Sequence, residues 1–200
     1  MIHGPRQNHR PPLSDLPEGA AALTPYVLIT SDAITLITPR ADKGQGAISV
    51  QAALVAEELD VDLDQIKTDP GPPSPAYYNT ALSGDAVPLR ATDESWLADT
   101  TRSLADAPMK FLGMQITGGS TTVPDGFDKL RHAGAVARET LKATAARLHN
   151  LSATDLRTER GAVILPDGTR LSYQSLAAEA ATTDPVTDVT LRAPSDWRLL

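Results

Sequence analysis

Residues 125–148, DGFDKLRHAGAVARETLKATAARL, form the strongest helical pattern in the sequence. Apolar side chains recur every three or four positions and predict one stripe along a helix, made of Phe127, Leu130, Ala133, Val136, Ala137, Leu141, Ala145 and Leu148. The opposite face is expected to hold the charged side chains, namely Lys129, Arg131, Arg138, Glu139, Lys142 and Arg147. Asn150 is a suitable terminator. We therefore expect an amphipathic helix here.

Toward the amino terminus, two β-branched runs predict a hairpin. Residues 26–30 and 34–38 are rich in Val, Ile and Thr, and the polar turn 31–33 separates them. A loop then leads into a second predicted helix, residues 48–59, for which Ser49 is a plausible N-cap.

Beyond that helix, residues 63–68 predict a short strand, and residues 162–172 predict a second hairpin around the turn Pro166–Thr169. Ser172 is placed to cap a short helix that reaches Ala180. The alternation of hairpins and amphipathic helices predicts an α+β fold in which the two are layered.

The domain organisation follows from proline and glycine content. Residues 1–23 are polar and rich in Pro, Gly and Asn, so we expect a flexible amino-terminal segment. One domain is expected over residues 24–200, with a long irregular segment at about 70–110 in which only 95–105 looks helical.

Composition excludes several classes of protein. The net charge is −7 and the pI is about 5.0, which argues against a nucleic-acid partner. No apolar run approaches the ~20 residues of a transmembrane segment. The chain has no cysteine, so it cannot itself hold a thiolate zinc site or a cysteine-ligated iron–sulfur cluster. Arg6 and Arg10 precede no apolar stretch, which argues against a signal peptide.

No self-contained catalytic or metal-ligand set is visible. The four histidines lack metal-ligand spacing, and no serine lies in a G-x-S-x-G elbow. Glu57, Glu58 and the acidic residues 60–64 are expected to form a solvated face at the end of a helix.

Two glycine-containing loops carry the better signal, because each lies just ahead of a predicted helix. They are Asp42–Gly46, which holds Gln45 between Gly44 and Gly46, and Gly118–Thr122, which adds three hydroxyl groups. Glycine lets backbone N–H groups approach an anion closely, and a helix start carries positive partial charge. Two such loops could cradle a phosphorylated cofactor. Composition alone, however, favours tight turns and helix caps.

Taken in order, several segments resemble the large subunit of the xanthine dehydrogenase/aldehyde oxidase family, most closely the isoquinoline 1-oxidoreductase beta-subunit type. The resemblance covers roughly residues 24–200. The segments that carry it are residues 34–37, 40–46, 54–61, 117–122, 130–138, 171–173 and 191–199.

The resemblance implies a partial molybdopterin-binding domain over residues 24–200. Its cofactor would be molybdopterin cytosine dinucleotide. Gln45 would hydrogen-bond the pterin or an oxygen near molybdenum, and Gly44 and Gly46 would allow the cofactor to approach closely. The second loop would hold the pterin or the diphosphate through Gly118, Gly119, Ser120, Thr121 and Thr122. Such subunits hydroxylate aldehydes or N-heterocycles and pass electrons to an iron–sulfur small subunit.

The chain departs from that family in two ways. The family loop reads E-M-G-Q-G, whereas Asp42 and Lys43 stand here, and the catalytic glutamate in G-V-G-E, the G-G-F-G-G loop and the hammerhead domain are absent. We expect an amino-terminal fragment or split subunit, not catalytic alone, that needs the remaining part of the large subunit. The alternative is a non-catalytic remnant or interaction protein. In the split subunit, an apolar face on the helix at 125–148 that the missing parts normally cover would be exposed. The substrate stays open because the residues that select it lie elsewhere in such subunits, and the compartment stays open because relatives occur in both the cytoplasm and the periplasm.

We predict that Lys43→Met changes the affinity for such a cofactor by less than about tenfold, ~1.4 kcal/mol, because a lysine beside an anion is electrostatically compatible while methionine restores the family residue. The measurement is cofactor content in a reconstituted complex. A larger loss would identify Lys43 as a direct ligand.

Overall fold

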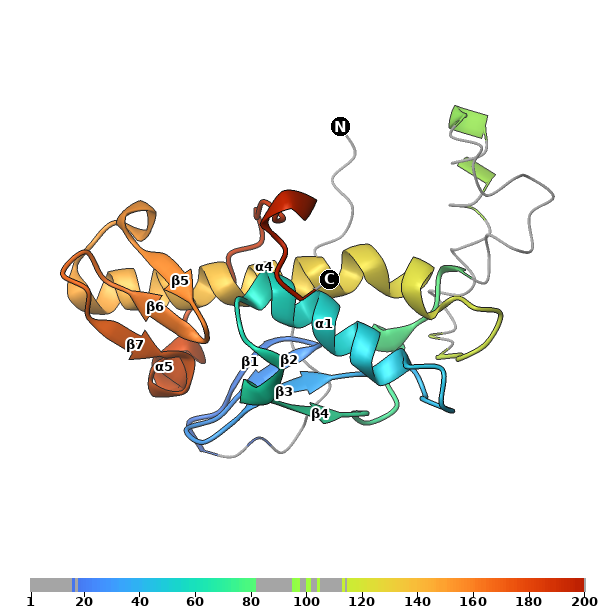
Figure 1. The fold of residues 1–200 in the computed structure, drawn as a ribbon, viewed down its shortest axis with the longest axis horizontal. Coiled ribbons are helices and arrows are strands. Elements are labelled where there is room, and N and C mark those ends of the chain that lie inside the picture. The colour runs from blue at the N-terminus through green and yellow to red at the C-terminus, as the bar shows by residue number, and fades with distance from the viewer. Residues whose placement is uncertain are drawn as a thin grey trace.

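The computed structural model describes residue 16, residues 18–81, residues 95–97, 100, 101, 104 and 113, and residues 115–199. The described fold is α+β, as predicted, with two small sheets arranged around a long central helix (Figure 1). Its helices are α1 (Ala47–Leu59), α4 (Thr122–His149) and α5 (Tyr173–Ala180). None of the described helices is long and apolar enough to cross a membrane.

The first sheet has the strand order β1-β2-β3-β4, and its strands are β1 (Ala21–Thr24), β2 (Val27–Ile29), β3 (Ile34–Ile37) and β4 (Ile66–Asp69). The predicted hairpin is present as antiparallel β2 and β3. Strand β1 begins inside the segment 1–23 that was expected to be flexible, and its buried Ala21 and Leu23 join the core. Residues 1–15 and 17 lie outside the described residues, as does more than half of the irregular segment expected at about 70–110.

Helix α1 connects β3 to β4, and these two strands run parallel, with Ile34 opposite Ile66. A parallel pair needs such a crossover, and a helix is its usual form. The helix begins at Ala47 after Gly46, whose φ of 78° is left-handed, so Ser49 lies inside the helix and is not its N-cap. The strand predicted at 63–68 begins as a 3-10 turn, η1 (Leu63–Gln65).

Helix α4 is the predicted amphipathic helix, extended at its amino end to Thr122. Most of its stripe is buried against α1, α5 and the first sheet: Leu130, Val136 and Leu141 are at most 5% exposed, whereas Leu148 at its end is 45% exposed. The expectation of an exposed apolar face on this helix is therefore wrong, since the chain's own elements cover that face.

The second sheet packs near the carboxyl end of α4 and has the order β5-β6-β7, with strands β5 (Arg157–Glu159), β6 (Ala162–Ile164) and β7 (Arg170–Ser172). Strands β6 and β7 form the second predicted hairpin. Ser172 caps α5 as expected, because its side chain accepts a hydrogen bond from the Ser175 N–H. Single 3-10 turns complete the chain at η2 (Pro75–Tyr77), η3 (Ala153–Asp155) and η4 (Pro194–Asp196).

Several charged side chains that were expected in solvent are buried. Glu57, Glu58 and Asp60 are at most 5% exposed, and Arg131 and Arg138 are 7% exposed. Glu58 accepts hydrogen bonds from Nε and Nη2 of Arg131 at 3.0 and 2.7 Å. The sequence pattern misses this because the carboxyl-terminal segment, far away in sequence, covers that side of α1 and α4 (Figure 1).

Gly134 sets how closely α1 and α4 approach. A Cβ atom at this position would lie 2.5 Å from the Val55 carbonyl oxygen and 2.9 Å from Glu58 Cβ. Because the first of these atoms is backbone, the two helices would have to separate.

We expect Gly134→Ala to lower the free energy of unfolding by about 2 kcal/mol, since overpacking costs ~1–3 kcal/mol and exceeds the gain of up to ~1 kcal/mol in helix propensity. Urea denaturation measures it. Gly126→Ala is the matched control in the same helix, because its Cβ would meet only the Leu130 side chain. Equal midpoints for the two variants would contradict the close approach.

Candidate functional site

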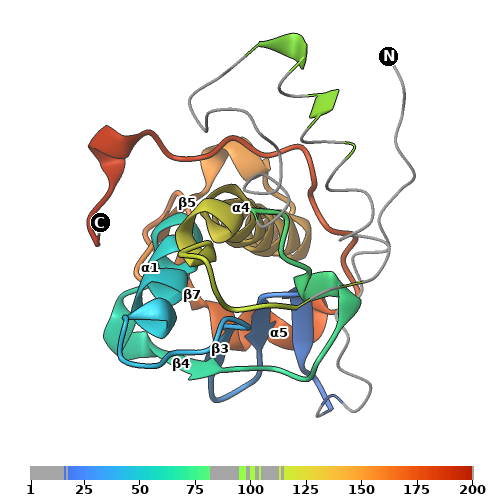
Figure 2. The ribbon, with the colours of Figure 1, turned by 90° about the vertical axis from the view of Figure 1, so that its right-hand side faces the viewer.

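The two glycine loops predicted to share a ligand lie side by side. The Ala41 N–H donates a hydrogen bond to Thr117 Oγ1 at 2.9 Å, and Gln115 Nε2 donates to the Pro39 carbonyl oxygen at 3.0 Å. These bonds join the loop between β3 and α1 to the segment that leads into α4. The two helices run in the same general direction and start at the same end of the molecule, which Figure 2 views end-on.

An ion pair between Arg40 and Asp125 is buried beneath the two loops and holds them together. Both side chains are 4% exposed, and Arg40 Nη2 lies 2.5 Å from Asp125 Oδ2. Arg40 also donates to the carbonyl oxygens of Tyr77 and Tyr78, at 2.9 and 3.1 Å. The backbone of Arg40 is held in turn by the Gln51 side chain on α1. One guanidinium thus connects the first loop, the segment after η2, and α4.

Asp125 lies in the first turn of α4, where a carboxylate complements the helix dipole. It also accepts hydrogen bonds from the N–H and hydroxyl of Thr80, at 2.8 and 3.0 Å, and from Lys129 Nζ at 2.6 Å. Burial alone would raise its pKa. The hydrogen bonds from Arg40 and Lys129 outweigh burial, so the pKa of Asp125 is lowered.

Asn79 connects the second loop to the same network. Its Nδ2 donates to the Ile116 carbonyl oxygen at 2.9 Å and to Thr121 Oγ1 at 2.8 Å. The hydroxyl of the buried Thr121 donates to the Gly118 carbonyl oxygen at 2.7 Å. Thr121 was expected to face a ligand, whereas its hydroxyl here closes the loop from inside.

The first loop is held by its own side chains. Asp42 accepts hydrogen bonds from the N–H groups of Gly44 and Ile48, at 2.8 and 3.0 Å, and these bonds lower the pKa of its carboxyl group. Gln45 accepts from the Lys43 N–H at 2.6 Å and donates to the Ala41 carbonyl oxygen at 2.8 Å. Asp42 therefore occupies amide groups at the start of α1 that an external anion would otherwise bind.

The remaining predicted residues form an open surface. Six of the eight are exposed and Thr122 is half-buried, the exposed ones being Gly44, Gln45, Gly46, Gly118, Gly119 and Ser120. A Cβ atom built at any of three of these glycines meets no atom within 4 Å; they are Gly44, Gly46 and Gly118. Ser120 has a φ of 57°, left-handed and rare for serine. The surface has room for a ligand to lie directly on the backbone.

The groups at this surface are suited to hydrogen bonding. The described residues contain no group of three or more His, Cys, Asp or Glu side chains that could hold a metal ion. What the surface does present is peptide groups, the Ser120 hydroxyl and the Lys43 ammonium group. These groups fit one wall of a cradle for a polar, hydrogen-bonding ligand.

Sequence reasoning missed the residues beneath the loops, namely Arg40, Gln51, Asn79 and Asp125. Asp125 alone had a local signal, as an acid in the first turn of a predicted helix. The partners of the others are 11 to 85 positions away in sequence, so no local pattern reveals them.

No protein-family model matches the chain. Over 147 residues it is 32% identical to isoquinoline 1-oxidoreductase subunit beta of Brevundimonas diminuta. The matched region covers 72% of this chain and 15% of that relative, so the chain spans only a small part of the length of the protein it resembles.

We predict that Asp125→Asn lowers the free energy of unfolding by about 3 kcal/mol at pH 7, because it leaves the Arg40 charge buried without its partner. The folded-state pKa of Asp125 is lowered, so its contribution is complete above the ordinary carboxyl pKa, ~4, and is lost as the pH falls through the folded value. Stability of the variant should therefore depend less on pH below about 5.

Chemical denaturation between pH 2 and 7 measures both effects. Asp64→Asn, which alters an exposed carboxylate on η1, should keep the parent midpoint at pH 7. A variant at residue 125 that loses stability as steeply in acid as the parent would contradict the role of this ion pair.

Proposed function

We propose that this chain, a relative of the beta subunit of isoquinoline 1-oxidoreductase, is part of the molybdopterin-binding subunit of a molybdenum hydroxylase. The observation that carries the proposal is the hydrogen bond between Ala41 and Thr117, the residues that directly precede the two loops. The loops are separated by more than 70 residues in sequence, yet both are exposed beside each other at the starts of α1 and α4.

In this proposal the two loops form one wall of the cofactor site. Gly44, Gly46 and Gly118 let the cofactor lie on the backbone, since no atom occupies the space where their side chains would be. Ser120 supplies a hydroxyl donor, and Gln45 turns from its hydrogen bonds within the loop to the pterin. When bound, the molybdenum group supplies the redox chemistry and the water-derived oxygen of hydroxylation.

The electrostatics of the loops suggest how a ligand would be oriented. The negatively charged Asp42 carboxylate already accepts hydrogen bonds from amide groups at the start of α1. A second anion is disfavoured there, because like charges at short distance repel. We therefore assign the hydrogen-bonding pterin edge to residues 44–46 and the diphosphate of a cytosine dinucleotide form to residues 118–122.

The remaining parts of the site would come from outside the described residues. An iron–sulfur small subunit would accept the electrons, and the remaining part of a large subunit would supply the catalytic base. The substrate would be an aldehyde or an N-heterocycle. In this proposal the chain binds the cofactor and positions it.

A second candidate function is that of a non-catalytic interaction protein with the same fold. Two of the expected ligand residues, Gln45 and Thr121, and the neighbouring Asp42 favour it. Gln45 and Asp42 are engaged within their own loop, and the Thr121 hydroxyl faces the interior. In that case the glycines serve only the turns.

The test is purification of the full chain together with the products of its neighbouring reading frames. We expect molybdenum by elemental analysis, and CMP released on acid hydrolysis, in the same fraction as the chain. A metal-free and nucleotide-free complex with those partners present would favour the interaction protein.

Gly118→Val links the result to the loops. The new side chain has room and no left-handed φ to strain it, so the fold should survive while the side chain projects into the cradle. We expect at least about a tenfold loss of bound cofactor, ~1.4 kcal/mol. Ala178→Val, at an exposed position on α5, is the control and should retain it.

A further inference from the structure

Residues 190–199, called the arm below, cross α1 and α4 as an extended segment with one 3-10 turn, η4 (Figure 1). We propose that the arm is a peptide ligand, and that its seat on α1 and α4 is a complete peptide-binding site that accepts the arm of a second copy of this chain as well as its own. The proposal is independent of any cofactor.

Glu57 on α1 binds the last part of the arm through its backbone. One carboxylate oxygen accepts from the Arg198 N–H at 2.8 Å, and the other accepts from the Leu199 N–H at 2.7 Å. Glu57 is 1% exposed. A buried carboxylate without donors would be costly, so these two amide groups satisfy it. The seat is thus built around the presence of a peptide.

Glu58, the next residue, binds the first part of the arm in the same way. It accepts from the Arg192 N–H at 3.0 and 3.2 Å. Helix α4 completes the recognition of the backbone, because Arg131 donates to the Arg192 carbonyl oxygen at 2.7 Å and Arg138 donates to that of Thr190 at 3.3 Å. Buried side chains of α1 and α4 therefore form hydrogen bonds with both N–H and carbonyl groups of the arm's backbone.

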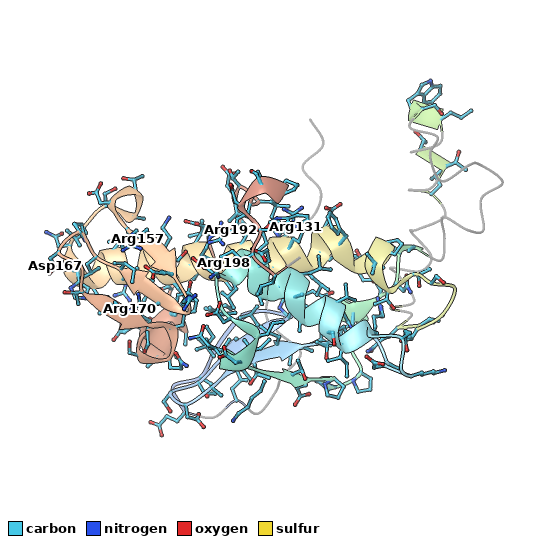
Figure 3. The ribbon with its side chains drawn as sticks, in the orientation of Figure 1. Arg131, Arg157, Asp167, Arg170, Arg192 and Arg198 are labelled. Atoms are coloured by element: carbon cyan, nitrogen blue, oxygen red, sulfur yellow. The ribbon has the colours of Figure 1, made fainter. Side chains whose placement is uncertain are left out.

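The arm's own side chains add specificity. Arg192 and Arg198 converge on Asp60, at 2.8 and 2.9 Å, and Figure 3 shows both beside Arg131. The Trp197 ring lies 5.0 Å from the Arg131 guanidinium carbon and 6.2 Å from the Phe127 ring, which it meets edge to face. The pattern recognised is a peptide in which an arginine is followed five residues later by an aromatic residue and six residues later by a second arginine.

Recognition does not depend on the covalent link to the rest of the chain. The contacts above use only groups within the arm, and the arm pairs with no strand. The preceding Thr187 and Asp188 are exposed. Exchange of an identical segment between two copies recreates the same contacts, which makes it a low-cost route to a dimer. A second copy is therefore the partner that fits this seat.

The first experiment cuts the full chain after it has folded. A protease recognition sequence is inserted between Thr187 and Asp188, and the cut protein is passed over gel filtration. We expect the released arm to co-elute with the rest of the chain, and a fluorescent synthetic peptide of residues 189–200 to replace it. Loss of the arm from a protein that keeps its unfolding midpoint would overturn the proposal.

Variants of the peptide test the contacts without any risk to the fold of the seat. Arg198→Ala in the peptide should raise its Kd at least about tenfold, whereas Ser195→Ala, which alters an exposed side chain, should leave the Kd unchanged. Glu57→Gln in the protein should weaken the parent peptide by a similar factor. Equal affinity for all the peptides would indicate nonspecific adhesion and would also overturn the proposal.

The second experiment tests exchange between copies. One full chain carries Glu57→Gln, which weakens its seat, and a differently tagged full chain carries Arg192→Ala and Arg198→Ala, which weaken its arm. Mixed at high concentration, this complementary pair should co-purify more strongly than either variant with itself. Equal recovery from all the pairings would show that the arm binds only in its own chain.

Discussion

The geometry of the candidate site depends on the buried ion pair of Arg40 and Asp125. Arg40 belongs to the loop after β3, and Asp125 belongs to the first turn of α4. Together with Asn79 they fix three segments at one point, so both glycine loops are held on the same surface. A buried charge pair is weak as a source of stability but restrictive in geometry, since either charge alone would be costly. We regard it as the constraint that fixes the position of the two loops relative to each other.

Local signals were enough to predict most of the elements. The periodicity of α4, the β-branched runs of β2 and β3, and Ser172 ahead of α5 each correspond to what is found. The observed boundaries of an element differ from the predicted ones where the conformation of an adjacent residue determines them. Gly46, for example, starts α1 in a left-handed conformation that spacing alone does not indicate.

The chemistry of the charged residues could not be predicted in the same way. Glu57 and Glu58 are next to each other at the end of a helix, a pattern typical of a solvated face, yet both are buried by residues more than 70 positions away. Likewise, the family resemblance implied that Gln45 is a ligand residue, but its hydrogen bonds in the loop depend on the local backbone path. Burial of a polar group is set by tertiary partners, which a single sequence does not display.

Helix α4 has a mechanical consequence that follows from its length. Its 28 residues rise ~1.5 Å each, about 42 Å in all. The two sheets share no strand, and each packs on a different part of this helix. Opening of either sheet would expose its own part of the single apolar stripe that runs along this helix. The helix therefore acts as a common spine, and the two halves of the described fold should melt as a single cooperative unit.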